Sequence, residues 1–123
     1  MSTHYDLIVL GAGTTAFAGA RIAATAGKKV LMVEQSHLGG TCVNWGCIPS
    51  KTLIHKAEMY HGARKGEGWG LNLQAGAPHC GTLMPLKQKA VVTVRETHYQ
   101  REVDQSPNIP VSYTHLRAHE TVL

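Results

Sequence analysis

A short apolar run and a glycine-rich turn open the chain, LIVLGAGTTA at residues 7–16. The run Leu7–Leu10 is typical of a fully buried parallel strand. A helical pattern follows from Thr14, and a second apolar run, Val30–Val33, leads directly into Glu34. Strand, glycine turn, helix, strand and acid thus follow one another in the order of a βαβ unit. This order predicts an α/β fold built on a doubly wound parallel sheet.

The expected first helix has a face of small residues, which would let the helix lie close to the sheet. Gly27 at its end is suited to a C-cap, because glycine tolerates the left-handed conformation that such caps use. The positions expected on the inward face are Ala16, Phe17, Ala20, Ala23 and Ala24.

Each part of the glycine turn has a role in dinucleotide binding. Gly11 allows the tight turn, and Gly13 lets the backbone approach a pyrophosphate. Backbone amides near Thr14 and Thr15, at the start of the helix, can donate to phosphate oxygens. Glu34 can accept hydrogen bonds from both hydroxyls of a ribose, and its charge disfavours a 2′-phosphate. The pattern therefore indicates FAD or NAD rather than NADP; the alternative is a glycine-rich turn without function.

Two cysteines lie in a second group of residues, GGTCVNWGCIPSK at 39–51. On a regular helix the Cα atoms of Cys42 and Cys47 would lie roughly 8–9 Å apart, beyond the ~7 Å limit for a disulfide. Pairing therefore requires an irregular backbone, and Gly46 is the residue at which it can bend. Because so small a ring stabilises the fold little, the pattern favours a disulfide that opens and closes.

The neighbours of the cysteines favour a reactive thiol. Pro49 suits the first turn of a helix whose amino terminus, with the charge of Lys51, would favour a thiolate at the second cysteine. Two unrelated reduced thiols are one alternative, and a zinc site, which would make the chain a zinc-stabilised interaction module, is another. The zinc ligands would be Cys42, Cys47, His79 and Cys80. Structural zinc knuckles favour shorter cysteine spacings, so a redox-active dithiol without metal is the preferred interpretation.

Taken together, these residues resemble the N-terminal FAD-binding region of the class I pyridine nucleotide-disulfide oxidoreductases. That family includes glutathione reductase, dihydrolipoamide dehydrogenase and mercuric reductase. The resemblance extends from Tyr5 to about Lys65, and the stretch GGTCVNWGCIPSK is specific to the group. It implies a truncated, partial Rossmann-like FAD-binding domain.

The resemblance also implies roles for single residues. Cys47 would be the flavin-proximal thiol with a charge-transfer contact, Cys42 the interchange thiol that attacks substrate, and Lys51 the lysine near flavin N5. Electrons would pass from NAD(P)H through FAD to a Cys42–Cys47 disulfide and then to a small-molecule substrate. The other implied FAD contacts are Gly11, Gly13, Thr14, Thr15, Glu34, Gly40 and Thr41.

Two branches of the family share features with the chain. The stretch Gly13–Ala18 is more similar to mercuric reductases, whereas Cys-Ile-Pro-Ser-Lys is shared with dihydrolipoamide dehydrogenases. Later positions also follow the mercuric reductase pattern, namely Gln88, Arg95, Tyr99 and Ser106–Ile109. The resemblance thus implies reduction of mercuric ion first, and turnover of a small disulfide as the alternative.

Catalytic chains of the family are several hundred residues long. The resemblance therefore implies that the NAD(P)H-binding and dimerisation domains, with a catalytic His-Glu pair, lie outside these 123 residues. The parent would be a homodimer, and the fragment inactive alone. The segment Val111–Leu123 resembles, letter for letter, one translated frame of a transposase library adapter. We expect residues 1–110 to be native and 111–123 to be an adapter-derived tail.

The remaining segments read as two helices joined by a loop. The first helix, Ser50–Lys65, is expected to bury Leu53, Ile54, Ala57 and Tyr60. A glycine-rich loop at 66–82 would contain a short extended piece, Trp69–Leu73, and Cys80 as a bystander thiol. The second helix, Pro85–Val103, is expected to turn Leu86, Ala90, Val91 and Val94 inward.

Composition allows one globular domain, with 43% hydrophobic and 16% charged residues. The net charge of +4 is scattered, with adjacent basic residues only at Lys28–Lys29 and Arg64–Lys65, so nucleic-acid binding is not expected. No apolar run reaches membrane-spanning length, so no membrane association is expected either. A disulfide that cycles fits the reducing cytoplasm.

Overall fold

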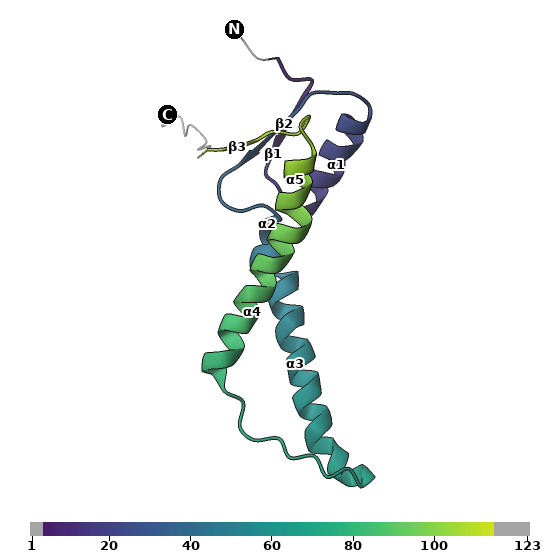
Figure 1. Ribbon diagram of the computed structural model, residues 1–123, viewed down its shortest axis with the longest axis vertical. Helices are drawn as coiled ribbons and strands as arrows, with labels where there is room; N and C mark the ends of the chain where they lie inside the picture. The colour runs from purple at the N-terminus through teal and green to yellow at the C-terminus, as the bar shows by residue number, and fades with distance from the viewer. Residues whose placement is uncertain (1–3, 115–123) are drawn as a thin grey trace, which may run out of the picture. The chain divides into compact units, whose positions relative to one another are not determined.

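The computed structural model describes residues 4–114, which divide into two compact units (Figure 1). The sheet unit lies within Met1–Gly40 and Arg95–Leu123, and the helical unit is Thr41–Val94. Three strands, a first helix and the last helical segments belong to the sheet unit. The two long helices, Cys47–Lys65 and Cys80–Val94, belong to the helical unit.

The sheet has three parallel strands in the order β1-β2-β3. They are β1 (Leu7–Leu10), β2 (Val30–Glu34) and β3 (Val111–Tyr113). Leu7 is paired with Val30, and Met32 with Val111. The parallel α/β architecture is therefore confirmed. The third strand is formed by the first residues of the expected adapter-derived tail, whose residues 115–123 lie outside the described part of the chain.

Burial differs sharply between the first two strands. Val30 and Met32 of β2 are fully buried, whereas Ile8 and Leu10 of β1 are 57% and 71% exposed. The prediction that β1 is fully buried is therefore wrong. The physical reason is the alternation of side chains along a strand: Ile8 and Leu10 share one face of β1, whereas Val9 lies on the other face and packs against the hydrophobic core.

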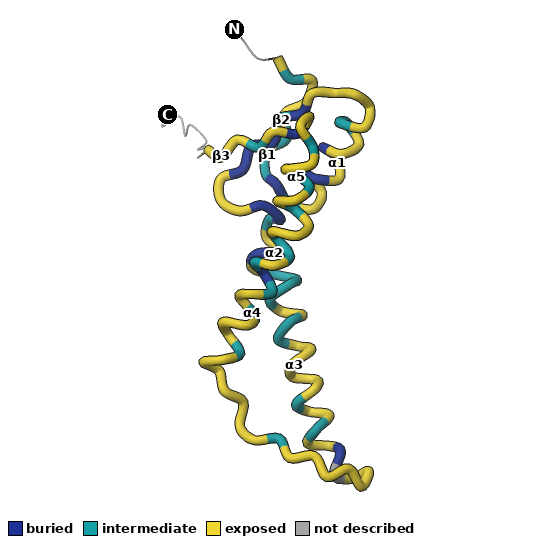
Figure 2. The backbone as a smooth tube through the Cα atoms, in the orientation of Figure 1, coloured by how far each residue is buried: buried dark blue, intermediate teal, exposed yellow. Residues whose placement is uncertain are grey.

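The first helix, α1 (Thr14–Thr25), follows the sequence prediction closely. Its small residues and Phe17 face the hydrophobic core, and Gly27 beyond its end has a φ of 76°. The core lies between α1, β2 and the turn that ends at Ile109, and the dark blue segments within the sheet unit in Figure 2 include it. Its buried members are Ala12, Phe17, Ala20, Val30, Met32, Leu38 and Ile109.

The last helical region differs from the single helix predicted over Pro85–Val103. It starts earlier as α4 (Cys80–Val94), passes through a π-helical turn, η2 (Arg95–Gln100), and ends as α5 (Arg101–Gln105). The earlier start follows from His79, whose carbonyl accepts hydrogen bonds from the amides of Thr82 and Leu83, both at 3.1 Å. Cys80 therefore begins a helix rather than lying in a loop.

The helical unit contains most of α2 (Gly40–Asn44), together with α3 (Cys47–Lys65), a 3-10 turn η1 (Gly66–Trp69), and α4. The sequence placed the start of α3 at Ser50, three residues late. Its predicted buried face is also wrong, because no residue of α3 is buried and Ile54 is 55% exposed. Within this unit α3 packs mainly against α4 and η1, and none of its residues is buried.

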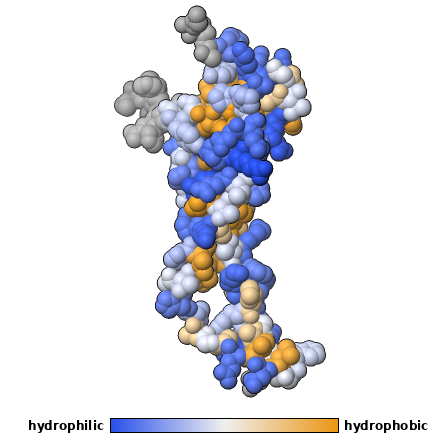
Figure 3. All heavy atoms as spheres, in the orientation of Figure 1, coloured by the Kyte–Doolittle hydropathy of each residue, from blue (hydrophilic) through white to orange (hydrophobic). Residues whose placement is uncertain are grey.

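The loop after η1 and the helix α4 both differ from the sequence predictions. No strand forms over Trp69–Leu73, where η1 ends and the backbone becomes irregular. In α4 only Val91 is fully buried, and Leu86 is 57% exposed instead of facing inward. Apolar side chains accordingly reach the surface of the helical unit (Figure 3). No helix within residues 4–114 combines the length and the hydropathy needed to cross a bilayer.

Candidate functional site

The glycine turn between β1 and α1 is held by backbone hydrogen bonds on both sides. Gly11 has a φ of 94°, a conformation that favours glycine, and its amide donates to the Val33 carbonyl at 2.7 Å. The Ala12 carbonyl accepts from the Gly39 amide, also at 2.7 Å. The predicted role of Gly11 in a tight turn is therefore confirmed.

Glu34 ends β2 with its carboxylate almost completely buried, at 7% exposure. One oxygen, Oε2, accepts a hydrogen bond from the Ala12 amide at 2.7 Å, and Oε1 accepts from the Ser36 amide at 2.8 Å. These bonds offset the cost of burying the charge. Each oxygen keeps a further lone pair, so the carboxylate can still accept hydrogen bonds from two hydroxyl groups.

Gly13 and Gly40 approach each other closely. A Cβ atom on Gly40 would lie 2.8 Å from the Gly13 Cα, and Gly40 has a φ of 61°. Gly13 also forms an isolated parallel bridge with Gly39. Because the blocking atom belongs to the backbone, a side chain at Gly40 could not be accommodated without moving the turn.

The start of α1 is open to a ligand. Its N-cap residue, Gly13, offers no side chain to the helix amides, and both Thr14 and Thr15 are exposed. Uncapped amides at a helix amino terminus suit a phosphate. The narrow glycine contact, the uncapped helix and the buried carboxylate of Glu34 therefore fit a dinucleotide that has free ribose hydroxyls.

Sequence reasoning missed one partner of this turn. The hydroxyl of Tyr99, on η2, lies 3.0 Å from the Thr14 Oγ1. The Tyr99 ring meets Phe17 edge to face, with ring centroids 5.0 Å apart and an interplanar angle of 86°. The only sequence signal was a general resemblance around Tyr99, because the two hydroxyls are 85 residues apart in the chain.

The two cysteines lie on either side of a break between helices. The α2 helix ends at Asn44 and α3 begins at Cys47, so the predicted irregular backbone is confirmed. Gly46 donates to the Thr41 carbonyl at 2.8 Å, and a Cβ at this position would lie 3.2 Å from the same oxygen. Close packing, rather than a positive φ, is therefore what requires glycine here.

Cys42 and Cys47 are both free, partly buried thiols in this structure. A hydrogen bond with Cys47 raises the pKa of the Cys42 thiol, and desolvation raises that pKa further. The positive charge of Lys51 acts in the opposite direction but is the smallest of the contributions. The hydrogen bond with Cys47 therefore favours the protonated form of Cys42.

The site residues predicted from the sequence fall into two groups. The sheet unit brings together Gly11, Gly13, Thr14 and Glu34, with Gly40 against Gly13. The helical unit contains Thr41 and both cysteines with Lys51. Each group is thus assembled within its own unit.

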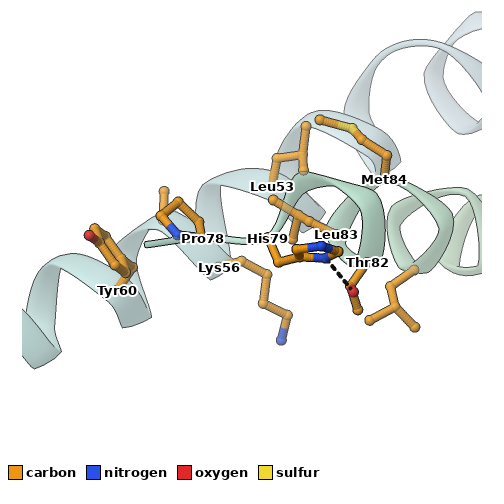
Figure 4. Close-up of a pocket in the computed structure, with 10 residues that line it drawn as sticks. Leu53, Lys56, Tyr60, Pro78, His79, Thr82, Leu83 and Met84 are labelled. Carbon is orange, nitrogen blue, oxygen red and sulfur yellow. Dashed lines mark hydrogen bonds between the residues drawn. The ribbon is translucent and has the colours of Figure 1, made fainter. Parts of the chain in front are cut away.

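The helical unit does not assemble the alternative zinc site. Among the described residues, no three His, Cys, Asp or Glu side chains are grouped as a metal ion would require. His79 instead lies 2.9 Å from the Thr82 Oγ1 through its Nδ1 atom (Figure 4). Beside it, a groove of about 670 Å³ runs between α3 and the start of α4, lined mainly by apolar groups that include Leu53, Tyr60 and Leu83.

Comparison with known proteins finds similarity to flavoprotein reductases of one family. A sequence profile described as pyridine nucleotide-disulphide oxidoreductase matches residues 5–120. The dihydrolipoyl dehydrogenase of Zymomonas mobilis is 51% identical over 71 residues, covering 58% of this chain and 15% of that protein. The mercuric reductase of Lysinibacillus sphaericus is 39% identical over 102 residues, covering 83% of this chain and 19% of that protein.

A solved structure shows the same fold. It is the Cu(II) complex of the HOCl-induced flavoprotein disulfide reductase RclA from Escherichia coli. The superposition has a TM-score of 0.69 at 28% identity, and it covers 89% of this chain and 21% of that one. The chain therefore spans about a fifth or less of the length of these relatives.

Proposed function

The chain belongs to the pyridine nucleotide-disulphide oxidoreductases, and from this membership we propose that it is the N-terminal, FAD-binding segment of a longer reductase. The observation that carries the proposal is that one chain contains both a dinucleotide-type glycine turn and the two thiols of Cys42 and Cys47. The full-length enzyme is the protein that contains this segment together with the rest of its reading frame.

Bound FAD would accept a hydride from NAD(P)H and pass the electrons on. The Glu34 carboxylate would accept hydrogen bonds from the ribose hydroxyls. Backbone amides from Gly13 to Thr15 would donate to the phosphates, with Gly40 and Thr41 as further contacts. Support comes from the buried carboxylate and the uncapped start of α1.

The two cysteines would carry the electrons to substrate. Two electrons and two protons convert the Cys42–Cys47 disulfide to the dithiol that this structure contains. With a small disulfide as substrate, the Cys42 thiolate attacks one sulfur and releases a thiol. Cys47 then attacks the mixed disulfide at Cys42, which releases the second thiol and reforms the ring. Proton loss from Cys42 starts this exchange, and Lys51 lowers the cost of that loss.

For the substrate we propose mercuric ion. The supporting observation is coverage, because similarity to the mercuric reductase of L. sphaericus extends over 83% of this chain, into the segment that contains η2. Two neighbouring thiols also suit a soft cation. The second candidate is a dihydrolipoamide dehydrogenase-like activity, favoured by the 51% identity of the Z. mobilis protein over a shorter stretch.

One experiment separates the two activities. The full-length enzyme is assayed for NAD(P)H oxidation dependent on mercuric ion, and in parallel for NAD⁺ reduction by dihydrolipoamide. We expect the first to be much the faster, and a Cys42→Ser variant to lose it. A faster reaction with dihydrolipoamide would assign the second function, and a purified enzyme without bound flavin would refute both.

Further proposals concern the parent molecule. We propose that it is a cytoplasmic homodimer which binds NAD(P)H through a domain outside these residues, and that Val111–Leu123 is a non-native tail. Strand formation by Val111–Tyr113 is compatible with a non-native origin of the tail. Strands pair through the backbone N–H and C=O groups, which every residue except proline supplies in full.

A further inference from the structure

The contact between Tyr99 and Thr14 joins two distant parts of the sheet unit. The two hydroxyl oxygens are 3.0 Å apart, and the Tyr99 ring rests edge-on against Phe17 of the same helix. Tyr99 therefore makes two separable contacts with the first turn of α1. The ring supplies packing, and the hydroxyl supplies a single directed hydrogen bond.

The helical geometry around Tyr99 is unusual. Tyr99 is the fifth residue of the π-helical turn η2, which interrupts an otherwise α-helical run from Cys80 to Gln105. A π-turn contains one more residue than an α-turn, so it rotates the side chains that follow by about 100° relative to an uninterrupted α-helix. Such turns are frequent at functional sites, and this one presents Tyr99 to the glycine turn.

The chemistry of the two hydroxyls sets the direction of the bond. By position either hydroxyl could donate, and we assign the donor to Tyr99 because a phenol is more acidic than an aliphatic alcohol. The proton of the Thr14 hydroxyl is then directed away from Tyr99 and is available to a second acceptor. Thr14 is the first residue of α1 and is exposed, next to an N-cap without a side chain.

We propose that Tyr99 is a positioning residue for the phosphate-binding turn, which orients the Thr14 hydroxyl so that it donates to a phosphate oxygen of the dinucleotide. The inference rests on the proposed FAD-binding function. A purely structural tyrosine would need only its ring, because packing against Phe17 does not involve the hydroxyl.

The test is a double-mutant cycle on flavin affinity in the full-length enzyme, with Tyr99→Phe, Thr14→Val and the double variant. Apoprotein is titrated with FAD, and flavin fluorescence gives the dissociation constant. Removing one neutral hydrogen bond should weaken FAD binding about 3- to 10-fold in Tyr99→Phe. The double variant should bind no more weakly than Thr14→Val, because the Tyr99 hydroxyl acts only through Thr14.

Tyr60→Phe is the matched control, since it removes a hydroxyl from a partly buried helical tyrosine of the helical unit. The urea midpoints of all apoproteins are measured in parallel. Tyr99→Phe should shift its midpoint no more than Tyr60→Phe does. Unchanged FAD affinity in Tyr99→Phe, additive losses in the double variant, or a loss explained by lowered stability would overturn the inference. Absence of flavin binding in the wild type would instead refute the proposed function on which it rests.

Discussion

At the scale of single residues, Glu34 is the most constrained group of the dinucleotide turn. Its carboxylate is buried and is bonded to two backbone amides, so the residue has a structural role in addition to the ligand-binding role proposed above. Glu34→Gln keeps the size of the side chain but removes the charge and one acceptor oxygen. The structural role alone predicts a loss of unfolding free energy of about 1–3 kcal/mol, since a buried amide loses its partner.

Glu34→Gln should also weaken FAD binding about ten- to a hundredfold, because charge-assisted hydrogen bonds to the ribose are lost. Isothermal titration of the apoprotein measures the affinity, and urea unfolding measures the stability. If flavin is retained as in the wild type, the ribose contact lies at another residue.

The thiols differ in their expected response to pH. The pKa of Cys42 is raised by its hydrogen bond with Cys47, so alkylation of Cys42 in the reduced protein should begin at a higher pH than for an ordinary thiol. A Cys47→Ser variant should shift the midpoint of the Cys42 profile downward. The folded state favours the protonated form of Cys42, so this hydrogen bond adds to the free energy of unfolding at low pH. The contribution is complete below the pKa that Cys42 has in the unfolded chain, and it is lost as pH rises through the pKa that Cys42 has in the folded protein. Mass spectrometry of iodoacetamide adducts measures the profile, and an identical midpoint in the variant would contradict the assignment.

The same pair predicts distinct spectra in the full-length enzyme. With Cys47 in the flavin-proximal position that the resemblance implies, Cys42→Ser should produce a long-wavelength absorbance band. Cys47→Ser should abolish that band. Absorbance spectra recorded at one pH test the prediction, which fails if the two variants are indistinguishable.

At the scale of elements, the close approach of Gly13 and Gly40 links the glycine turn to the start of α2. Gly40→Ala would place a Cβ 2.8 Å from the backbone of Gly13 at a positive φ, so it should lower the free energy of unfolding by about 1–3 kcal/mol. Gly62→Ala is the control, because nothing lies within 4 Å of its Cβ position in α3 and a helical glycine gains by this change. Equal midpoints for the two variants in urea would show that the contact is not tight.

Local patterns predicted the elements that local chemistry determines. The turn at Gly11, the helix α1 and the break before Cys47 follow from nearby glycines and from the periodicity of apolar residues. Other features depend on distant partners and could not be predicted. The contact of Tyr99 with Thr14 spans 85 residues, and the exposure of Ile54 depends on how few elements pack against α3.

At the scale of the whole molecule, the open edge of β1 governs the behaviour of the isolated 123-residue chain. Ile8 and Leu10 are exposed on a strand that has one partner strand among residues 4–114, an arrangement that promotes pairing with other chains. We expect the isolated chain to associate, to bind FAD weakly and to lack NAD(P)H-dependent activity. A monomeric, cooperatively melting, yellow preparation would contradict this expectation.

A charged residue on β1 tests whether its open edge causes the association of the isolated chain. Ile8→Lys should increase the soluble fraction of the isolated chain, because lysine on an edge strand opposes pairing. Ile54→Lys on α3 is the control, since its side chain is 55% exposed but lies outside the sheet. Sedimentation of cell extracts and size-exclusion chromatography measure the effect. An equal gain from both variants would assign association to general surface hydropathy.

The hydrogen bond from the Ala12 amide to Glu34 has a consequence for ligand capture. Both partners of this bond belong to the chain itself, so the bond forms as part of the fold and the conformational entropy of the turn is lost during folding rather than on association. A rigid receptor of this kind needs no loop closure before it accepts its ligand. The hydrogen bond between Ala12 and Glu34 should therefore make nucleotide binding a rapid, single-step association. In Glu34→Gln the association rate constant should fall along with the affinity.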